Sequence, residues 1–160
     1  MEYRNYPYYC INKNTIMNTR NKFLIGEQGG AELYADKDTL IKLIHDCLCD
    51  GLHYFSSYGI EVKVSKRAYN DARTEIKQEG VELCYEDVWI QVLKDGGSIA
   101  FIDVENAGDM TGFLSLSDST LNNFAKVPFQ NIINLLNEEY DAGDCDTILQ
   151  TLVWGEVVFG

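Results

Sequence analysis

The sequence predicts an α+β fold, in which an antiparallel sheet built from two hairpins carries about five or six helices packed mainly on one face. Two stretches rich in strand-forming residues, 22–36 and 98–116, are each interrupted by glycines, which is typical of hairpins. Most other stretches show the helical spacing of apolar residues, with capping residues or proline at their starts. Helices packed against an antiparallel sheet account for both patterns.

The first hairpin is formed by KFLIGEQ and GAELYA, which meet at a Gly-Gly turn. A helix follows from Leu40 to about Phe55, and Asp36 or Asp38 can cap it. Gly51 is a weak point in this helix, because glycine inside a helix costs about 1 kcal/mol relative to alanine.

The middle of the chain is predicted to hold one strand and two helices. IEVKV alternates apolar and charged residues and indicates a half-buried strand. Ser65 caps a helix through KRAYNDARTEIKQ, whose narrow apolar side predicts a place on the outside of the fold. VELCY fits either a short strand or a lead-in. The next helix, EDVWIQVLKDGG, begins with acidic residues and has Lys94 near its end, which complements the helix dipole.

The second hairpin pairs Ile99–Val104 with Phe113–Leu116. One of the residues 117–119 can cap a helix through LNNFAKV, and Pro128 starts another, FQNIINLLNEEY. A final helix is predicted over DTILQTLVWGEVV, although its later turns could instead form a terminal strand.

The length of 160 residues predicts a single domain over residues 1–160. A hairpin followed by a capped helix occurs twice, at 22–56 and at 98–126, so a duplicated β-β-α unit is an alternative interpretation.

The composition predicts a cytoplasmic protein that does not enter a membrane. The N-terminal residues lack the apolar run of a signal peptide, and no stretch approaches the 18 or so apolar residues of a membrane span. Five cysteines, an odd number with no CxxC pair, predict reduced thiols and no disulfide framework. No cofactor is predicted, and the sequence does not indicate an oligomeric state.

The net charge of −12 is concentrated in the second half of the chain. Residues 1–80 carry 11 acidic and 11 basic side chains, whereas residues 81–160 carry 14 acidic and two basic ones, and 2 − 14 = −12. Such asymmetry suggests a charged interaction surface. It argues against direct nucleic-acid binding, because contacts to the phosphate backbone require clustered lysine and arginine.

His45, Cys49 and His53 lie at spacings of four on the polar side of the first predicted helix, where we expect them to face solvent. Two ligands four residues apart can share a zinc ion, so His45 with Cys49, or Cys49 with His53, is a candidate metal-binding pair. All three cannot bind one ion, because eight residues of helix span about 12 Å. Further ligands would have to come from elsewhere in the chain.

No motif in the sequence names a reaction. The phosphate-binding loop GxxxxGK[ST], the dinucleotide motif GxGxxG and the hydrolase motif GxSxG are all missing. Cys49 with His45 or His53 is the one nucleophile and base pair that the sequence offers, and an exposed helix face does not exclude water as a catalytic cleft does.

Carboxylates are the most abundant candidate binding groups. Asp103 and Glu105 lie two apart at the end of a predicted strand, with Asp109 in the adjoining loop, and such a group could hold a divalent cation. The run NEEYDAGDCD does not fit the calcium loop of an EF-hand, and Asp144 or Asp146 in it can serve as the N-cap of the last helix. Together these segments give the predicted partner-binding residues Asp103, Glu105, Asp109, Glu138, Glu139, Asp141, Asp144 and Asp146.

Two segments, EDVWIQVLKDGG and ILQTLVWGEVVFG, resemble uncharacterised proteins from phages and mobile elements of gut bacteria. The resemblance covers about the last half of the chain and assigns no role to any residue. It favours an inhibitor over an enzyme.

Three functional hypotheses follow. The first is a non-enzymatic acidic protein that binds a basic partner, such as a nucleic-acid enzyme whose groove it occupies as a nucleic-acid mimic, in the manner of anti-restriction, anti-CRISPR or immunity proteins. The second is a small metal-dependent enzyme or metal-binding protein that uses the His45–His53 helix or the carboxylates of Asp103, Glu105 and Asp109. The third is a globular protein whose charge serves only solubility.

Overall fold

The computed structural model describes residues 8–12, 21–106 and 108–160, and it confirms the α+β fold. The elements in chain order are β1 (Tyr8–Asn12), β2 (Lys22–Gln28), β3 (Ala31–Asp36), α1 (Lys37–Gly51), α2 (His53–Ser57), β4 (Ile60–Lys63), α3 (Lys66–Ile76), α4 (Tyr85–Lys94), β5 (Ile99–Asp103), β6 (Gly112–Leu114), α5 (Asp118–Leu121), the 3₁₀ helix η1 (Asn122–Lys126), α6 (Phe129–Leu136) and α7 (Ala142–Trp154).

Both predicted hairpins are present, as β2–β3 and β5–β6, but they belong to different sheets. The strand orders are β1-β3-β2 and β4-β5-β6, and both sheets are antiparallel. Each hairpin therefore gains a third strand from an earlier part of the chain. The predicted IEVKV strand supplies the third strand of the second sheet.

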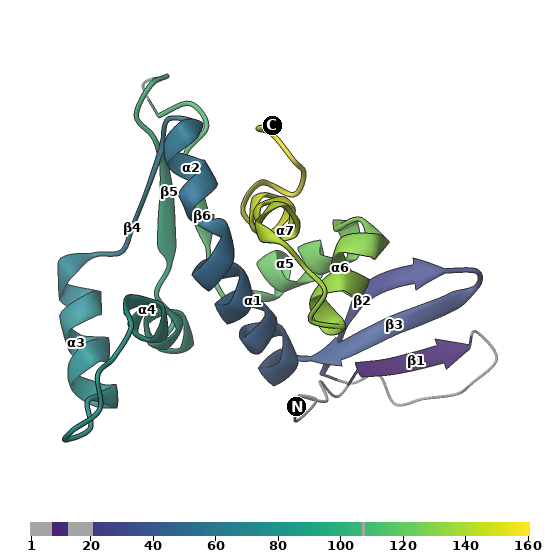
Figure 1. The fold of residues 1–160 in the computed structure, drawn as a ribbon, viewed down its shortest axis with the longest axis horizontal. Coiled ribbons are helices and arrows are strands. Elements are labelled where there is room, and N and C mark those ends of the chain that lie inside the picture. The colour runs from purple at the N-terminus through teal and green to yellow at the C-terminus, as the bar shows by residue number, and fades with distance from the viewer. Residues whose placement is uncertain (1–7, 13–20, 107) are drawn as a thin grey trace.

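Helix α1 is the central element of the fold. Figure 1 shows it between the β1-β3-β2 sheet and the β4-β5-β6 sheet, with α7 alongside. Its apolar face, including Leu40, Ile44 and Leu48, is fully buried. The main core extends from this face to both sheets and to α6 and α7.

The second sheet is packed on one face. Phe101 of β5 lies against Phe55 of α2, with ring centroids 4.9 Å apart, and against Trp154 of α7 at 5.9 Å. On the opposite face, where side chains alternate with these, Glu61 is exposed and Phe113 of β6 is 57% exposed. Helices α3 and α4 form a smaller cluster of their own around Ala72, Val88 and Val92.

Three helices are capped at their N-termini by residues that the sequence predicts as caps. Asp36 accepts a hydrogen bond from the backbone N–H of Thr39, Ser65 caps α3, and Ser117 caps α5. The predicted caps of the last helix, Asp144 or Asp146, are wrong, because α7 begins earlier and Asp141 caps it. The chain from 81 to 84 forms no strand, so VELCY is a lead-in. Helix α7 ends at Trp154, and no terminal strand follows it in the described residues.

In the part of the chain that the structure describes, no helix is both long and apolar enough to cross a lipid bilayer.

Gly51 permits the close packing of α1 on α7. A Cβ atom at this position would lie 2.9 Å from the Cβ of Cys145 and 3.1 Å from its backbone carbon. We therefore expect Gly51→Ala to lower the free energy of unfolding by about 1–3 kcal/mol, since overpacking outweighs the helix propensity of alanine. Urea unfolding checks this, with the exposed Lys42→Ala on the same helix as a control expected within about 0.5 kcal/mol of wild type. A stabilised Gly51→Ala protein would contradict the packing.

Candidate functional site

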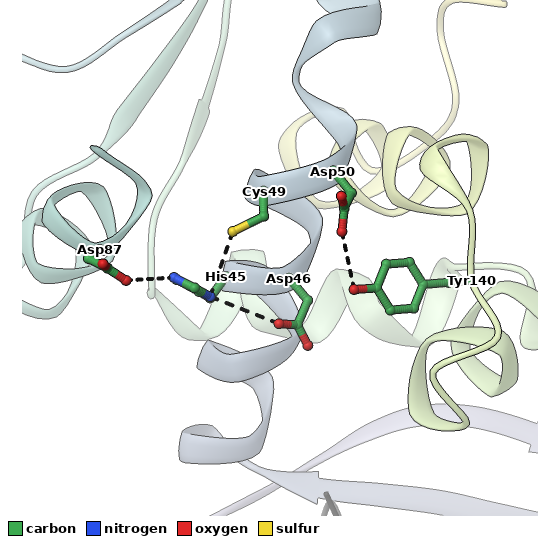
Figure 2. A network of polar contacts seen from close by, with 6 residues as sticks. All are labelled: His45, Asp46, Cys49, Asp50, Asp87 and Tyr140. Atoms are coloured by element: carbon green, nitrogen blue, oxygen red, sulfur yellow. Dashed lines mark hydrogen bonds and ion pairs between the residues drawn. The ribbon is translucent and has the colours of Figure 1, made fainter. Parts of the chain in front are cut away.

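The polar side of α1 forms a network with α4 and with the loop between α6 and α7 (Figure 2). His45 Nε2 lies 2.9 Å from Asp87 Oδ1 of α4, and His45 Nδ1 lies 3.9 Å from both Asp46 Oδ1 and Cys49 Sγ. The expectation that His45 faces solvent is thus wrong in part, because α4 packs beside it and leaves its side chain 33% exposed. Cys49 is exposed, as expected.

The predicted metal ligands do not come together as a set. Helix α1 ends at Gly51, and His53 begins α2, where its ring stacks on Tyr54 at 4.5 Å. Only His45 and Cys49 are neighbours. Over residues 8–12, 21–106 and 108–160, no three or more His, Cys, Asp or Glu side chains are grouped so that they could hold a metal ion.

The surroundings of Cys49 oppose a role as a nucleophile. Burial, followed by the negative charges of Glu86, Asp50, Asp46 and Asp87, raises the pKa of the Cys49 thiol to about 11. A reactive cysteine needs the opposite shift, because the thiolate is the attacking species. His45 does not lower the pKa of the thiol; its ring contacts the carboxylates of Asp87 and Asp46 as well as Cys49.

We call the carboxylates of Asp46 and Asp50 on α1, and of Glu86 and Asp87 on α4, the acidic band. All four act on Cys49, which lies among them. Tyr140, in the loop before α7, donates a hydrogen bond to Asp50 Oδ2 at 3.2 Å, so this loop continues the band. Burial and the charges of Asp46 and Asp50 raise the pKa of Tyr140.

The structure separates the eight predicted partner-binding carboxylates by burial. Asp103, Asp144 and Asp146 are at most 9% exposed. Glu105 and Asp109 are exposed near the β5–β6 turn, and Glu138, Glu139 and Asp141 are exposed between α6 and α7. These two exposed groups are well apart in Figure 1, so the eight residues do not form one patch.

The three buried carboxylates hold the fold together. Asp144 accepts hydrogen bonds from the Asn131 side chain at 2.6 Å, from the Asn134 side chain and from the Asp141 backbone N–H, which joins α6 to α7. Asp103 accepts the backbone N–H groups of Glu105 and Asn106. The hydrogen bond from the backbone N–H of Asn106 is the largest cause that lowers the pKa of Asp103.

Asp146 anchors the C-terminal segment. It accepts hydrogen bonds from Tyr58 at 2.9 Å and from Gln150 at 3.0 Å, while burial raises its pKa. The side-chain oxygen Oε1 of Gln150 in turn accepts hydrogen bonds from the backbone N–H groups of Val158 and Phe159. Only one oxygen of the Asp146 carboxylate is used in this way, since Oδ1 is buried without a hydrogen-bond partner among the described residues.

Two ion pairs formed by lysine or arginine, Lys63 with Glu61 and Arg67 with Asp71, lie in the first half of the chain. In the second half, the carboxylate of Asp87 contacts a histidine, His45.

A sum of charge over each half of the chain does not reveal the acidic band. Asp46 and Asp50 belong to the half whose charges cancel, and Glu86 and Asp87 fit the positive end of a helix dipole. The spacing of four between Asp46 and Asp50 was the one available signal, since residues four apart are neighbours on a helix surface.

We expect Asp144→Ala to lower the free energy of unfolding by about 3 kcal/mol, because the change removes a buried carboxylate. The side chains of Asn131 and Asn134 then lose their hydrogen-bond acceptor. Glu139→Ala, at an exposed carboxylate in the same segment, should stay within about 0.5 kcal/mol of wild type. Chemical denaturation followed by circular dichroism measures both. Equal effects of the two changes would contradict a structural role for Asp144.

Hydrogen bonding to Asp46 and to Asp87 raises the pKa of His45 against the opposing effect of burial. The raised pKa means that the folded state favours the imidazolium. Its contribution to stability is therefore present below the unfolded-state pKa and is lost as the pH rises through the folded-state pKa. Asp87→Asn and Asp46→Asn should each lower the pKa of His45, as NMR titration of its ring signals would show.

The control for this titration is Asp71→Asn, which removes an exposed carboxylate of α3 that pairs with Arg67. It should leave the titration of His45 unchanged. An unaltered midpoint in both Asp87→Asn and Asp46→Asn would show that neither carboxylate stabilises the imidazolium.

Comparisons with known proteins did not identify a relative. No family model matches the chain. A search of curated proteins found no match, and a search of solved structures found none either. The functional proposal is therefore based on the geometry and charge of this chain's own residues.

Proposed function

We propose that this protein is a non-enzymatic, acidic interaction protein whose acidic band binds a basic surface of a partner protein. The observation that carries the proposal is geometric: the 2.9 Å contact between His45 and Asp87 joins α1 to α4, which are distant in sequence, and Asp46, Asp50, Glu86 and Asp87 lie around Cys49. Burial is the largest cause that raises the pKa of the Cys49 thiol to about 11, and the negative charges of these four carboxylates add to it.

The exposed carboxylates between α6 and α7 extend this negative surface. Tyr140 joins their loop to Asp50, and Glu139 and Asp141 flank Tyr140 in the sequence. Complementary potentials accelerate encounter and select cationic partners. The buried carboxylates Asp103, Asp144 and Asp146 take no part in this binding surface.

We propose a nucleic-acid enzyme as the partner and inhibition as the outcome. Enzymes of this class carry large basic grooves that bind phosphates, and surface carboxylates can occupy such a groove as a nucleic-acid mimic. Anti-restriction, anti-CRISPR and immunity proteins are the classes of inhibitor that this mode of action suggests. The binding would take place in the cytoplasm, which agrees with the free cysteines of the described residues.

The test compares Asp50→Lys/Glu86→Lys, in the acidic band, with Asp71→Lys/Glu75→Lys on the exposed side of α3. Both pairs change the net charge by the same amount, so only the position differs. The tagged proteins are used to capture partners from host lysate at low and high salt, after thermal unfolding has shown that both variants are folded. We expect the band variant to lose capture of nucleic-acid enzymes and the α3 variant to retain it.

Capture should fall as salt rises, and duplex DNA should compete for the captured enzyme, because both act on the same basic groove. A third variant, Glu138→Lys/Glu139→Lys, tests the α6–α7 loop while the capping residue Asp141 is left in place. Equal capture by the band variant and the α3 variant would disprove the proposed surface. Unchanged capture by the third variant would confine the surface to α1 and α4.

A further inference from the structure

We propose that a groove along the free edge of β4 binds an extended, basic segment of the partner, which adds to the β4-β5-β6 sheet as a fourth strand. The proposal rests on the proposed function and specifies the chemistry of the partner. The groove has a volume of about 700 Å³ and is bounded by α2, β4, α4 and the end of β5.

The groove follows the edge of the sheet. Ile60, Glu61 and Val62 all line it, although Glu61 points to the opposite face of β4 from the other two. A cavity that touches three consecutive strand residues lies along the edge and not over one face. The strand order β4-β5-β6 leaves this edge of β4 without a neighbouring strand among the described residues.

The backbone of β4 offers hydrogen-bonding groups to the groove. Gly59 C=O accepts the N–H of Val104 at 3.0 Å, and the register continues through the pairs Glu61 with Ile102 and Lys63 with Ala100. Hydrogen-bonded and non-hydrogen-bonded pairs alternate in an antiparallel ladder. The N–H and C=O groups of Ile60 and Val62 therefore point away from β5, toward the free edge. An added strand would use these groups.

The groove has apolar walls. Tyr85 is 48% exposed and Val104 is 59% exposed, so both present apolar surface at the groove. Trp89 stands beside Tyr85 with ring centroids 5.3 Å apart. Aromatic faces at this position can cover the apolar side chains of a bound segment or the stems and charges of its lysines and arginines.

The charge of the groove selects a basic occupant. Its lining includes the carboxylates of Glu61 and Glu105 and no lysine or arginine. Glu105 folds over Gly59, where a Cβ atom would come within 2.4 Å of its Cδ, so its carboxyl group stands at the groove. Glu61 already pairs with Lys63, at 2.9 Å, whereas the carboxylate of Glu105 has no ion pair within the described ranges.

These features define the occupant as a segment that alternates apolar and basic residues. In an added strand, one set of side chains would face the side of Ile60 and Val62, and the other set would face Glu61. Tyr85 also links the groove to the acidic band, because it directly precedes Glu86 in α4. One partner surface could therefore contact both.

The test measures binding of a short, fluorescently labelled peptide of alternating lysine and valine to the full chain by fluorescence anisotropy. We expect salt-sensitive binding. A peptide with the same composition but with the lysines and valines in separate blocks, and a peptide with N-methylated backbone at alternate residues, should each bind at least about tenfold more weakly. Equal binding of all three would overturn strand addition, since it would show attraction by charge alone.

Two variants locate the site on the protein. Val62→Pro removes an N–H that points to the free edge, and proline is tolerated at such a position, so β5 pairing should survive. Glu61→Gln/Glu105→Gln removes the groove charges, and Asp71→Asn/Glu75→Gln on α3 is its charge-matched control. Each of the first two should weaken binding at least about tenfold and the control should not. Thermal unfolding verifies folding, and the methylated peptide tests the edge without altering the protein.

The outcomes separate this proposal from the proposed function. Peptide binding that is equal in the groove variants and the α3 control would overturn the groove, while loss of partner capture in Asp50→Lys/Glu86→Lys would still support the acidic band. Peptide binding confined to the groove, with unchanged partner capture in the band variant, would support the groove alone. A wild-type dimer in light scattering that becomes monomeric in Val62→Pro would show that a second copy occupies the edge, and would also overturn the proposal.

Discussion

The contact between α1 and α7 is the constraint on which the rest of this fold depends. Gly51 lets the two helices approach until Cys145 occupies the space that a side chain would fill, and Cys47 and Cys145 are both fully buried in the main core. Because α1 lies between the two sheets, its position relative to α7 determines where each sheet packs (Figure 1). A helix held so closely on its apolar side presents its polar side in one orientation.

That orientation creates the candidate site. His45 lies on the side of α1 that faces α4, where Asp87 comes to within 2.9 Å of the imidazole, whereas Asp50 points to Tyr140 in the loop before α7 (Figure 2). The His45 imidazolium offsets part of the negative charge between the helices, which is a reason for two carboxylates to approach it. Under the proposed function, the charge that remains would attract the cationic groups of a partner.

The carboxylates of this protein have two different roles, one for those that are buried and one for those that are exposed. Those of Asp103, Asp144 and Asp146 are buried and accept hydrogen bonds that shape a turn, join α6 to α7 and anchor the C-terminal segment. A buried charge requires such partners, because removal from water is costly without them. The carboxylates of Glu138 and Glu139 are exposed and remain accessible to an external partner. A net charge of −12 therefore overstates the charge that a partner would meet.

Local sequence patterns determined the kinds of element, both hairpins, the caps Asp36 and Ser65, and the exposure of α3, because periodicity and capping depend on residues within one or two turns. Only the tertiary structure decided that the hairpins belong to separate sheets, that Asp141 and not Asp144 caps α7, and that Asp46, Asp50, Glu86 and Asp87 form one surface. These features depend on which distant segments pack together, and that is set by competition among the apolar faces of the whole chain. A short sequence window contains only one side of each such contact.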